Sequence, residues 1–207
     1  MRKSCLLPCL LFFLVLTGFS QENERASSFN EICERISVRR ITKGEFKQTK
    51  LIKRIKREMA SSGVFIISSG DGILWQSQKP YFSSMAMTKN ALIQSGSDGK
   101  KSVLKAEDNK TFRQFATILS SVFEGDARGL TENFDVEFIG SLTGWNINLI
   151  PKNSTVRSVI SEIEMVGNDS IDGMVLHEAN GDFIRYEFFN QTYPDALTSE
   201  EKSFFEP

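Results

Sequence analysis

The sequence predicts a mostly β fold, in which one long antiparallel sheet of about ten strands is interrupted by a helical insertion. Short apolar runs with strand-like alternation fill residues 40–99 and resume at Phe134, separated by turn signals such as residues 69–72. Between these two blocks, the apolar residues of segment 111–124 recur at helical spacing. A sheet with that many strands normally curls or closes on itself.

The first twenty residues read as a secretory signal peptide. Two basic residues precede an apolar run over residues 6–16, which is too short for a convincing membrane span, and small residues lie before a cleavage site near Ser20. A lipoprotein signal would have a cysteine where this chain has Phe19, so no lipid anchor is expected. We therefore expect an exported protein with one domain over residues 21–207.

Charge and cysteine content exclude several classes of partner and chemistry. Loss of the signal peptide leaves 23 basic residues against 26 acidic ones, a net charge of −3, which argues against nucleic acid or an anionic membrane surface as a partner. Cys33 remains as the only cysteine, so no internal disulfide is possible. It lies on the apolar stripe of a short helix expected from Ser28 to Ile36, which favours a buried thiol over a nucleophile.

Little in the sequence indicates catalysis. His177 is the only histidine, which leaves no zinc site and no Ser-His or Cys-His pair, and no glycine-rich phosphate loop is present. We therefore expect a binding protein that is not an enzyme and has no metal and no cofactor. Two carboxylates that meet only in space would instead indicate a secreted hydrolase.

The expected strands lay down a large apolar surface. Because side chains alternate along a strand, Phe65 and Ile67 share one face, as do Ile73 and Trp75. Two methionines on a later strand add thioethers, which adapt to a flexible ligand. The candidate residues of this surface are Phe46, Phe65, Ile67, Ile73, Trp75, Met85 and Met87. The pattern fits either a sheet core or the wall of a ligand cavity.

The helical insertion has an apolar face rich in phenylalanine. Thr111 and Gln114 have the spacing of a capping box, and Gly125 is a stop signal, which predicts a helix from Thr111 to Glu124. Its candidate contact residues are Phe112, Phe115, Leu119 and Phe123.

A basic run separates the first two expected strands. It contains Lys50, Lys53, Arg54, Lys56 and Arg57. Such a run is usually a solvated loop, and a docking patch for an acidic partner is the alternative.

The order of these motifs resembles the LolA family, the periplasmic carriers of outer-membrane lipoproteins in Gram-negative bacteria. The motifs are Phe46-x-Gln48, Gly63-x-Phe65-x-Ile67, Trp75, Pro80, the helical insertion, Gly144-Trp145 to Pro151, and the hairpin around Gly181-Asp182. The resemblance implies an unclosed antiparallel β-barrel whose concave apolar face is covered by lid helices. The phenylalanine-rich helix would then be a lid, and the helix near Cys33 another part of the cover.

The same resemblance implies a function and a set of partners. It implies a monomeric periplasmic carrier that shelters the acyl chains of lipoproteins or lipids and delivers lipoproteins towards the outer membrane. The donor would be an inner-membrane lipoprotein-releasing ABC transporter, and the acceptor an outer-membrane receptor. A lipid- or lipoprotein-sensing regulator of the same fold is the alternative.

One position departs from the family pattern. Well-studied members carry an arginine followed by proline at the end of the second strand, where the arginine holds the lid closed. This chain has Ser69 and Gly70 there. A serine cannot supply the planar, charged fork of a guanidinium, so we expect a weaker latch at Ser69.

Overall fold

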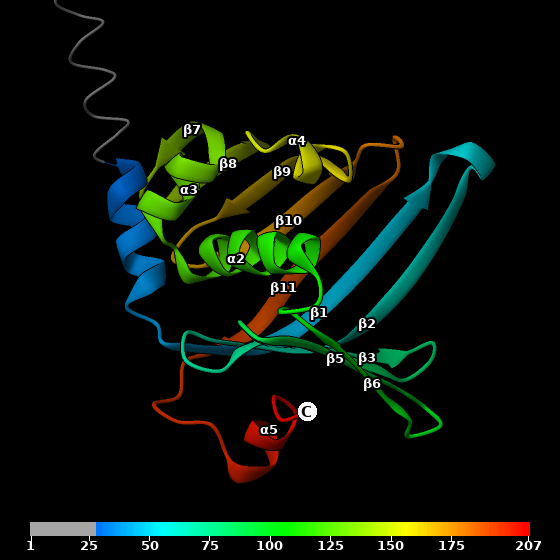
Figure 1. The fold of residues 1–207 in the computed structure, drawn as a ribbon. Coiled ribbons are helices and arrows are strands. Elements are labelled where there is room, and N and C mark those ends of the chain that lie inside the picture. Colours follow the sequence, from blue (N-terminus) through cyan, green and yellow to red (C-terminus); the bar gives the residue numbers. More distant parts are fainter. Residues whose placement is uncertain (1–27) are drawn as a thin grey trace, which may run out of the picture.

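The computed structural model describes residues 28–207, apart from the side chains of residues 110 and 111, and confirms the predicted mostly β architecture (Figure 1). The signal peptide predicted for residues 1–20 lies outside the described residues. The strands are β1 (Ile41–Ile52), β2 (Arg57–Ser68), β3 (Gly72–Lys79), β4 (Ser83–Met87), β5 (Ala91–Gly96), β6 (Lys101–Lys105), β7 (Phe134–Ser141), β8 (Gly144–Pro151), β9 (Ile160–Gly167), β10 (Ile171–Glu178) and β11 (Phe183–Thr192).

All eleven strands belong to one antiparallel sheet. Its order is β6-β5-β4-β3-β2-β1-β11-β10-β9-β8-β7, so the first and last strands of the chain pair at the centre. The two edge strands, β6 and β7, do not pair with each other in the described part of the chain. The sheet is therefore curved but unclosed, as predicted.

Helices cover the concave side of the sheet. Four helices lie together on this side (Figure 1): a helix over residues 28–37, α2 (Lys110–Glu124), α3 (Ala127–Asn133) and the short α4 (Ser154–Arg157). The connection between β1 and β2 is a single 3-10 turn, η1 (Lys53–Ile55), and α5 (Ser199–Ser203) lies apart from the other helices near the C-terminus.

The ends of α2 differ in part from the prediction. The helix begins at Lys110, and its N-cap is Asn109, whose side chain accepts a hydrogen bond from the backbone N–H of Phe112 at 2.8 Å. The capping box assigned to Thr111 was therefore wrong, because the extended backbone that an N-cap requires occurs two residues earlier. The stop at Gly125 is confirmed, since its φ of 64° lies in the left-handed region that glycine adopts readily.

The two faces of the sheet carry separate cores. The larger core joins the concave face to the helices and includes Phe46, Phe65 and Ile73. The smaller core lies on the opposite face of the sheet. There, Leu197 and Phe205 of the C-terminal segment pack with strand residues such as Leu74, which alternate along the strands with residues of the larger core. Strand alternation thus buries both faces of the β1–β5 half of the sheet.

Candidate functional site

The sheet register brings the predicted strand residues onto one concave wall. It sets Phe65 against Trp75, Ile67 against Ile73, Trp75 against Met85, and Ile73 against Met87. Phe46 joins them from β1, with its ring centroid 5.1 Å from that of Trp75. The wall therefore contains all seven sheet residues that the sequence singled out.

Six aromatic rings from four strands and one helix meet at the centre of this wall. We call Phe46, Phe65, Trp75, Phe123, Tyr186 and Phe188 the aromatic cluster. Trp75 contacts the other five rings. Its ring centroid lies 5.1 Å from those of Phe46 and Tyr186, and the largest of the five distances, 6.0 Å, separates it from Phe123. Phe123 is the point where α2 packs against the sheet.

Sequence reasoning missed two members of the aromatic cluster. Tyr186 and Phe188 lie on β11, more than a hundred residues from Trp75, and reach it only because β11 pairs with β1. Their alternation along one strand was visible in the sequence. The pairing that turned their shared face towards Trp75 was not.

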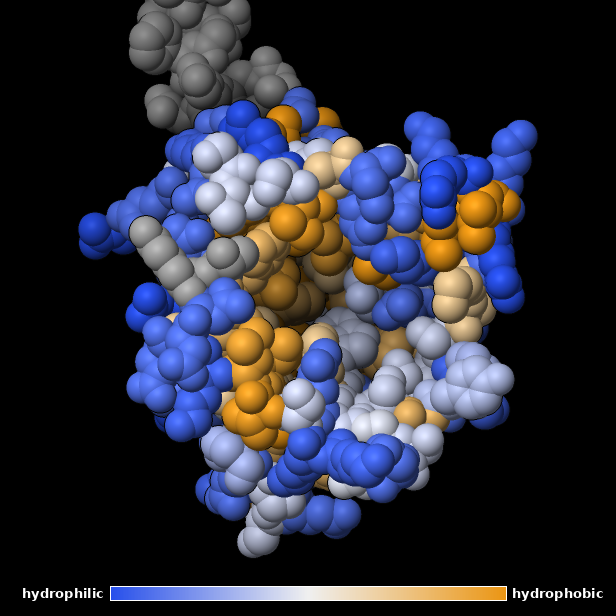
Figure 2. All heavy atoms as spheres, turned by 45° about the vertical axis from the view of Figure 1, so that its right-hand side comes forward, coloured by the Kyte–Doolittle hydropathy of each residue, from blue (hydrophilic) through white to orange (hydrophobic). Residues whose placement is uncertain are grey.

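An open hollow lies along this wall, on the side where the sheet is uncovered. It has a volume of about 510 Å³, and its lining includes Gln48, Trp75, Met85 and Tyr186. Much of its lining is polar, including five serines and Lys100. Figure 2 shows a hollow in this side of the molecule, with hydrophobic residues along one side of it and paler, more polar residues along the other. None of its lining residues is a carboxylate, so the hollow offers no acid pair for the hydrolase alternative.

Behind the open hollow, the space between the wall and the helices is nearly filled. A cavity lined by Phe65, Ile67, Phe123 and Phe188 has a volume of only about 20 Å³, room for about one water molecule. Phe46, Phe65, Ile73 and Met87 are buried, whereas Met85 keeps 39% of its surface exposed. In this conformation the protein's own side chains occupy the interior.

The four predicted residues of α2 differ in how deeply they are buried. Phe112 and Phe123, near the two ends of the helix, are buried, whereas Phe115 and Leu119 are only partly buried against the concave core. Val122 is fully buried, because α2 also packs beside α3 and α4. The middle of α2 therefore presents partly exposed apolar side chains next to the wall.

Trp75 also carries an unsatisfied polar group. Its indole N–H is buried and has no hydrogen-bond partner among the described residues. A buried donor without a partner costs about 1–3 kcal/mol. Trp75 lines the open hollow, but its N–H is buried, so an acceptor oxygen on a ligand would reach this donor only after neighbouring side chains move.

Ser69 lies where the resemblance expected a latch. It lines a hollow of about 500 Å³ together with Glu124 and Gly125 at the C-terminal end of α2. Its backbone N–H donates to the carbonyl of Arg40 at 3.0 Å, and in the described part of the chain no hydrogen bond joins its side chain to α2. The position faces the C-terminal end of α2, but its side chain does not hold the helix.

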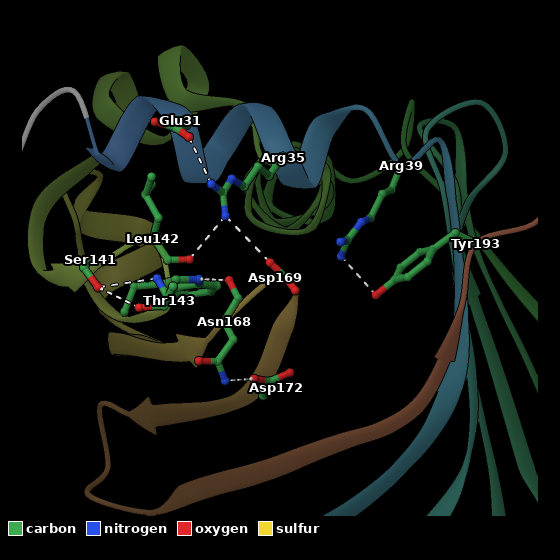
Figure 3. A network of polar contacts seen from close by, with 11 residues as sticks. Glu31, Arg35, Arg39, Ser141, Leu142, Thr143, Asn168, Asp169, Asp172 and Tyr193 are labelled. Atoms are coloured by element: carbon green, nitrogen blue, oxygen red, sulfur yellow. Dashed lines mark hydrogen bonds and ion pairs between the residues drawn. The ribbon is translucent and has the colours of Figure 1, made fainter.

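Two arginines fasten the helix over residues 28–37 instead (Figure 3). The Arg35 guanidinium donates to the carbonyl of Leu142 at 3.2 Å and lies 3.7 Å from Asp169, so it reaches the β7–β8 and β9–β10 turns. Arg39 donates to the Tyr193 hydroxyl at 3.0 Å and stacks over its ring. Sequence reasoning missed these contacts, since each joins segments at least 100 residues apart.

Two acids near the site, the buried Cys33 and the half-buried Tyr186, have raised pKa values. Burial, with a smaller contribution from Asp126, raises the pKa of the Cys33 thiol to about 12, which supports the buried, unreactive thiol expected from the sequence. Burial, and secondly the charge of Glu178, raises the pKa of Tyr186 to about 12. Both groups are neutral at physiological pH.

One group of potential metal ligands lies away from the hollow. Glu162, Glu164 and His177 place ligand atoms within 4.8 Å of one another, and His177 Nε2 lies 2.6 Å from Glu164 Oε1. It is the one such trio within residues 28–207, and β9–β10 register assembles it. These residues could hold a divalent cation, although the sequence, with one histidine, predicted no metal site.

The protein is thus a curved, unclosed sheet with helices over its apolar face. The model of the family described as "Outer membrane lipoprotein carrier protein LolA" matches residues 39–204. The chain belongs to this family, as the order of its motifs predicted. No curated protein sequence matches it as a relative.

Several solved structures are similar to this chain at low identity. A DUF1329 family protein from Desulfovibrio piger is 8% identical, with 88% of this chain and 98% of that chain covered and a TM-score of 0.46. A LolA superfamily protein from Nitrosomonas europaea is 9% identical, with 84% and 99% covered and a TM-score of 0.45. An outer-membrane lipoprotein-sorting protein domain from Vibrio parahaemolyticus is 8% identical, with 86% and 98% covered and a TM-score of 0.43. The family assignment rests on the family model.

Within the described residues, no helix has the length and apolar character needed to cross a membrane.

Proposed function

We propose that this protein is a periplasmic carrier that shelters the acyl chains of lipoproteins or lipids and delivers lipoproteins towards the outer membrane. An acyl chain left in water is costly, at about 0.8 kcal/mol for each methylene and so roughly 12 kcal/mol for sixteen carbons. A carrier must offer apolar surface in its place. The concave wall and the partly exposed face of α2 supply such surface.

Trp75 is the observation that carries the proposal. Its ring is the centre of the aromatic cluster and lines the open hollow, while its buried N–H has no partner within residues 28–207. An acyl chain attached through an ester or amide presents both a hydrocarbon tail and a carbonyl acceptor. The tail would lie on the aromatic cluster, and the carbonyl would accept a hydrogen bond from Trp75.

Loading requires α2 to move. The cavity of about 20 Å³ behind the aromatic cluster is too small for a long chain, so the chain must displace Phe123 from Trp75 and Phe188. This exchange replaces one apolar contact with another, which keeps its net cost low. The ligand would then lie between the wall and the partly buried residues Phe115 and Leu119.

The family supplies the proposed direction of transport. In this proposal an inner-membrane lipoprotein-releasing ABC transporter loads the carrier, and an outer-membrane receptor accepts its cargo. The predicted signal peptide over residues 1–20 would bring the chain to the periplasm, where it works as a monomer.

Mass spectrometry of lipids bound to the protein purified from its native compartment tests this function. We expect an acylated lipoprotein or lipid to co-purify. In vitro, Trp75→Phe keeps an aromatic ring but removes the hydrogen-bond donor. The variant should therefore bind an acyl ester roughly tenfold more weakly than the wild-type protein does, and its affinity for an alkane of equal length should be unchanged. Absence of any acyl ligand, together with failure to take up an acyl probe, would overturn the proposal.

A further inference from the structure

The β1–β2 hairpin extends past β3 at the open end of the sheet, while β1 stays paired with β11 as far as Leu51. The pairing of β2 with β3 ends at Ser62 and Lys79, whereas β1 and β2 stay paired out to Ile52 and Arg57. Figure 1 shows the hairpin projecting away from the rest of the molecule. Gln48, which lines the open hollow, precedes the η1 turn in β1, so the tip lies about 17 Å beyond it at roughly 3.3 Å per residue.

The tip of this hairpin is basic and apolar at once. We call Lys53, Arg54, Ile55, Lys56 and Arg57 the basic tip; all five are exposed, and Ile55 has 54% of its surface accessible. Its four cationic side chains form no salt bridge among the described residues. Lys50, by contrast, lies 2.6 Å from Glu178 and is neutralised.

We propose that the basic tip docks on an anionic lipid surface, with its cations among the headgroups and Ile55 inserted between them. Each basic residue near an anionic bilayer contributes about 1 kcal/mol, and an exposed apolar side chain gains by leaving water. The net charge of −3 argued against such a surface, but the fold gathers these four cations at one end of a hairpin. Asp182 also lies beside this end, where its carboxylate accepts a hydrogen bond from the backbone N–H of Lys53 at 2.9 Å.

The shape of the basic tip favours a membrane over an acidic protein. A stable protein interface buries about 800 Å² on each partner, which calls for a broad surface. The end of a two-stranded hairpin is narrow, whereas a bilayer accepts a few cations and one inserted side chain. Docking would hold the open hollow close to the bilayer, and this consequence rests on the proposed carrier function.

Binding to vesicles tests the docking. The probe surfaces are vesicles of phosphatidylglycerol with phosphatidylcholine, and vesicles of phosphatidylcholine alone. The variant Arg54→Gln, Lys56→Asn, Arg57→Gln removes three charges and keeps at position 56, where φ is 50°, a residue that tolerates the left-handed region. The matched control Lys89→Gln, Lys105→Gln, Lys202→Gln removes three exposed charges elsewhere.

We expect the wild-type protein to bind the anionic vesicles, and to do so more weakly as salt rises. The tip variant should bind the anionic vesicles roughly 100-fold more weakly than the wild-type protein. The control variant should bind them with an affinity within a few-fold of wild type. Neither variant should bind vesicles of phosphatidylcholine alone. Equal loss in both variants, or wild-type affinity in the tip variant, overturns the docking. Failure of the wild-type protein to bind at low salt also overturns it and directs the search to an acidic protein partner.

Uptake of a soluble acyl probe without vesicles keeps the two proposals apart. The tip variant should take up the probe as the wild-type protein does, since the basic tip does not line the hollow. Vesicle binding without probe uptake would contradict the carrier function alone. Probe uptake without vesicle binding would contradict the docking alone.

Discussion

At the scale of single residues, burial separates the wall into a core part and an exposed part. Ile73 keeps only 6% of its surface exposed, whereas Met85, on the next strand of the same face, keeps 39%. The sequence could not divide these residues, because alternation assigns them all to one face. The division follows from how far α2 covers each strand.

Paired substitutions at these two positions test the division. Ile73→Glu should lower the free energy of unfolding by at least about 3 kcal/mol, because it buries a charge without a partner. Met85→Glu should leave the fold intact, since water reaches the side chain, and should instead weaken binding of an acyl probe. Urea unfolding and probe titration measure the two effects. Equal stability of both variants would show that Ile73 is not part of the core.

Cys33 and Tyr186 predict a loss of stability at alkaline pH. Their folded-state pKa values of about 12 exceed their ordinary values of 9.0 and 10.0, so the fold favours the neutral forms. Their stabilising effect is complete below pH 9.0 and is lost as the pH rises towards 12. Each group should lower the free energy of unfolding by up to about 1.4 kcal/mol per pH unit in that window.

Urea unfolding at neutral pH and at about pH 10.5 measures this dependence. Cys33→Ala and Tyr186→Phe should each flatten the slope, because each removes one titrating group. Stability that does not change between the two conditions would contradict the burial of these groups.

At the scale of elements, α2 and the helix over residues 28–37 cover the sheet by different means. The helix over residues 28–37 is fastened to three loops by Arg35 and Arg39, through two hydrogen bonds and one ion pair. The described part of α2 depends chiefly on apolar contacts such as Phe123 with Trp75. We therefore expect α2 to be the more readily displaced of the two.

Ser69→Arg tests the control of α2. A guanidinium in the hollow beside Glu124 and Gly125 would lie at the helix C-terminus, where it can donate to free carbonyls and complement the helix dipole. Amide exchange in α2 should slow, and a ligand that needs the open lid should bind more weakly. Hydrogen exchange with and without an acyl probe measures both. Protection of α2 equal to that of the strands in the unliganded wild-type protein would mean that α2 is not a lid.

At the scale of the whole molecule, the proposed binding face and a structural face lie on opposite sides of the sheet. The C-terminal segment closes the structural face through Leu197 and Phe205, and the Lys43 ammonium lies 2.6 Å from a carboxylate oxygen of Glu201. The other face holds the aromatic cluster and the open hollow. Changes on the structural face should therefore alter stability without altering binding.

Phe205→Ala measures this separation. Removal of a buried phenylalanine side chain should lower the free energy of unfolding by about 3–5 kcal/mol, while the affinity of the remaining folded protein for an acyl probe stays unchanged. Phe188→Ala on the proposed binding face is the matched comparison. It should reduce both the free energy of unfolding and the affinity for the acyl probe. Loss of probe affinity in Phe205→Ala alone would show that the two faces are coupled.

The sequence by itself determined the mostly β class, the order of strands and helical insertion, the stop of α2 at Gly125, and the family. These features are local, because alternation, helical spacing and turn residues act over a few neighbouring positions. Only the tertiary structure decided that Tyr186 and Phe188 join Trp75, that α2 begins after Asn109, and that the basic tip projects beyond β3. These outcomes depend on the pairing of β1 with β11 and on burial, and both are set by contacts between residues far apart in the chain.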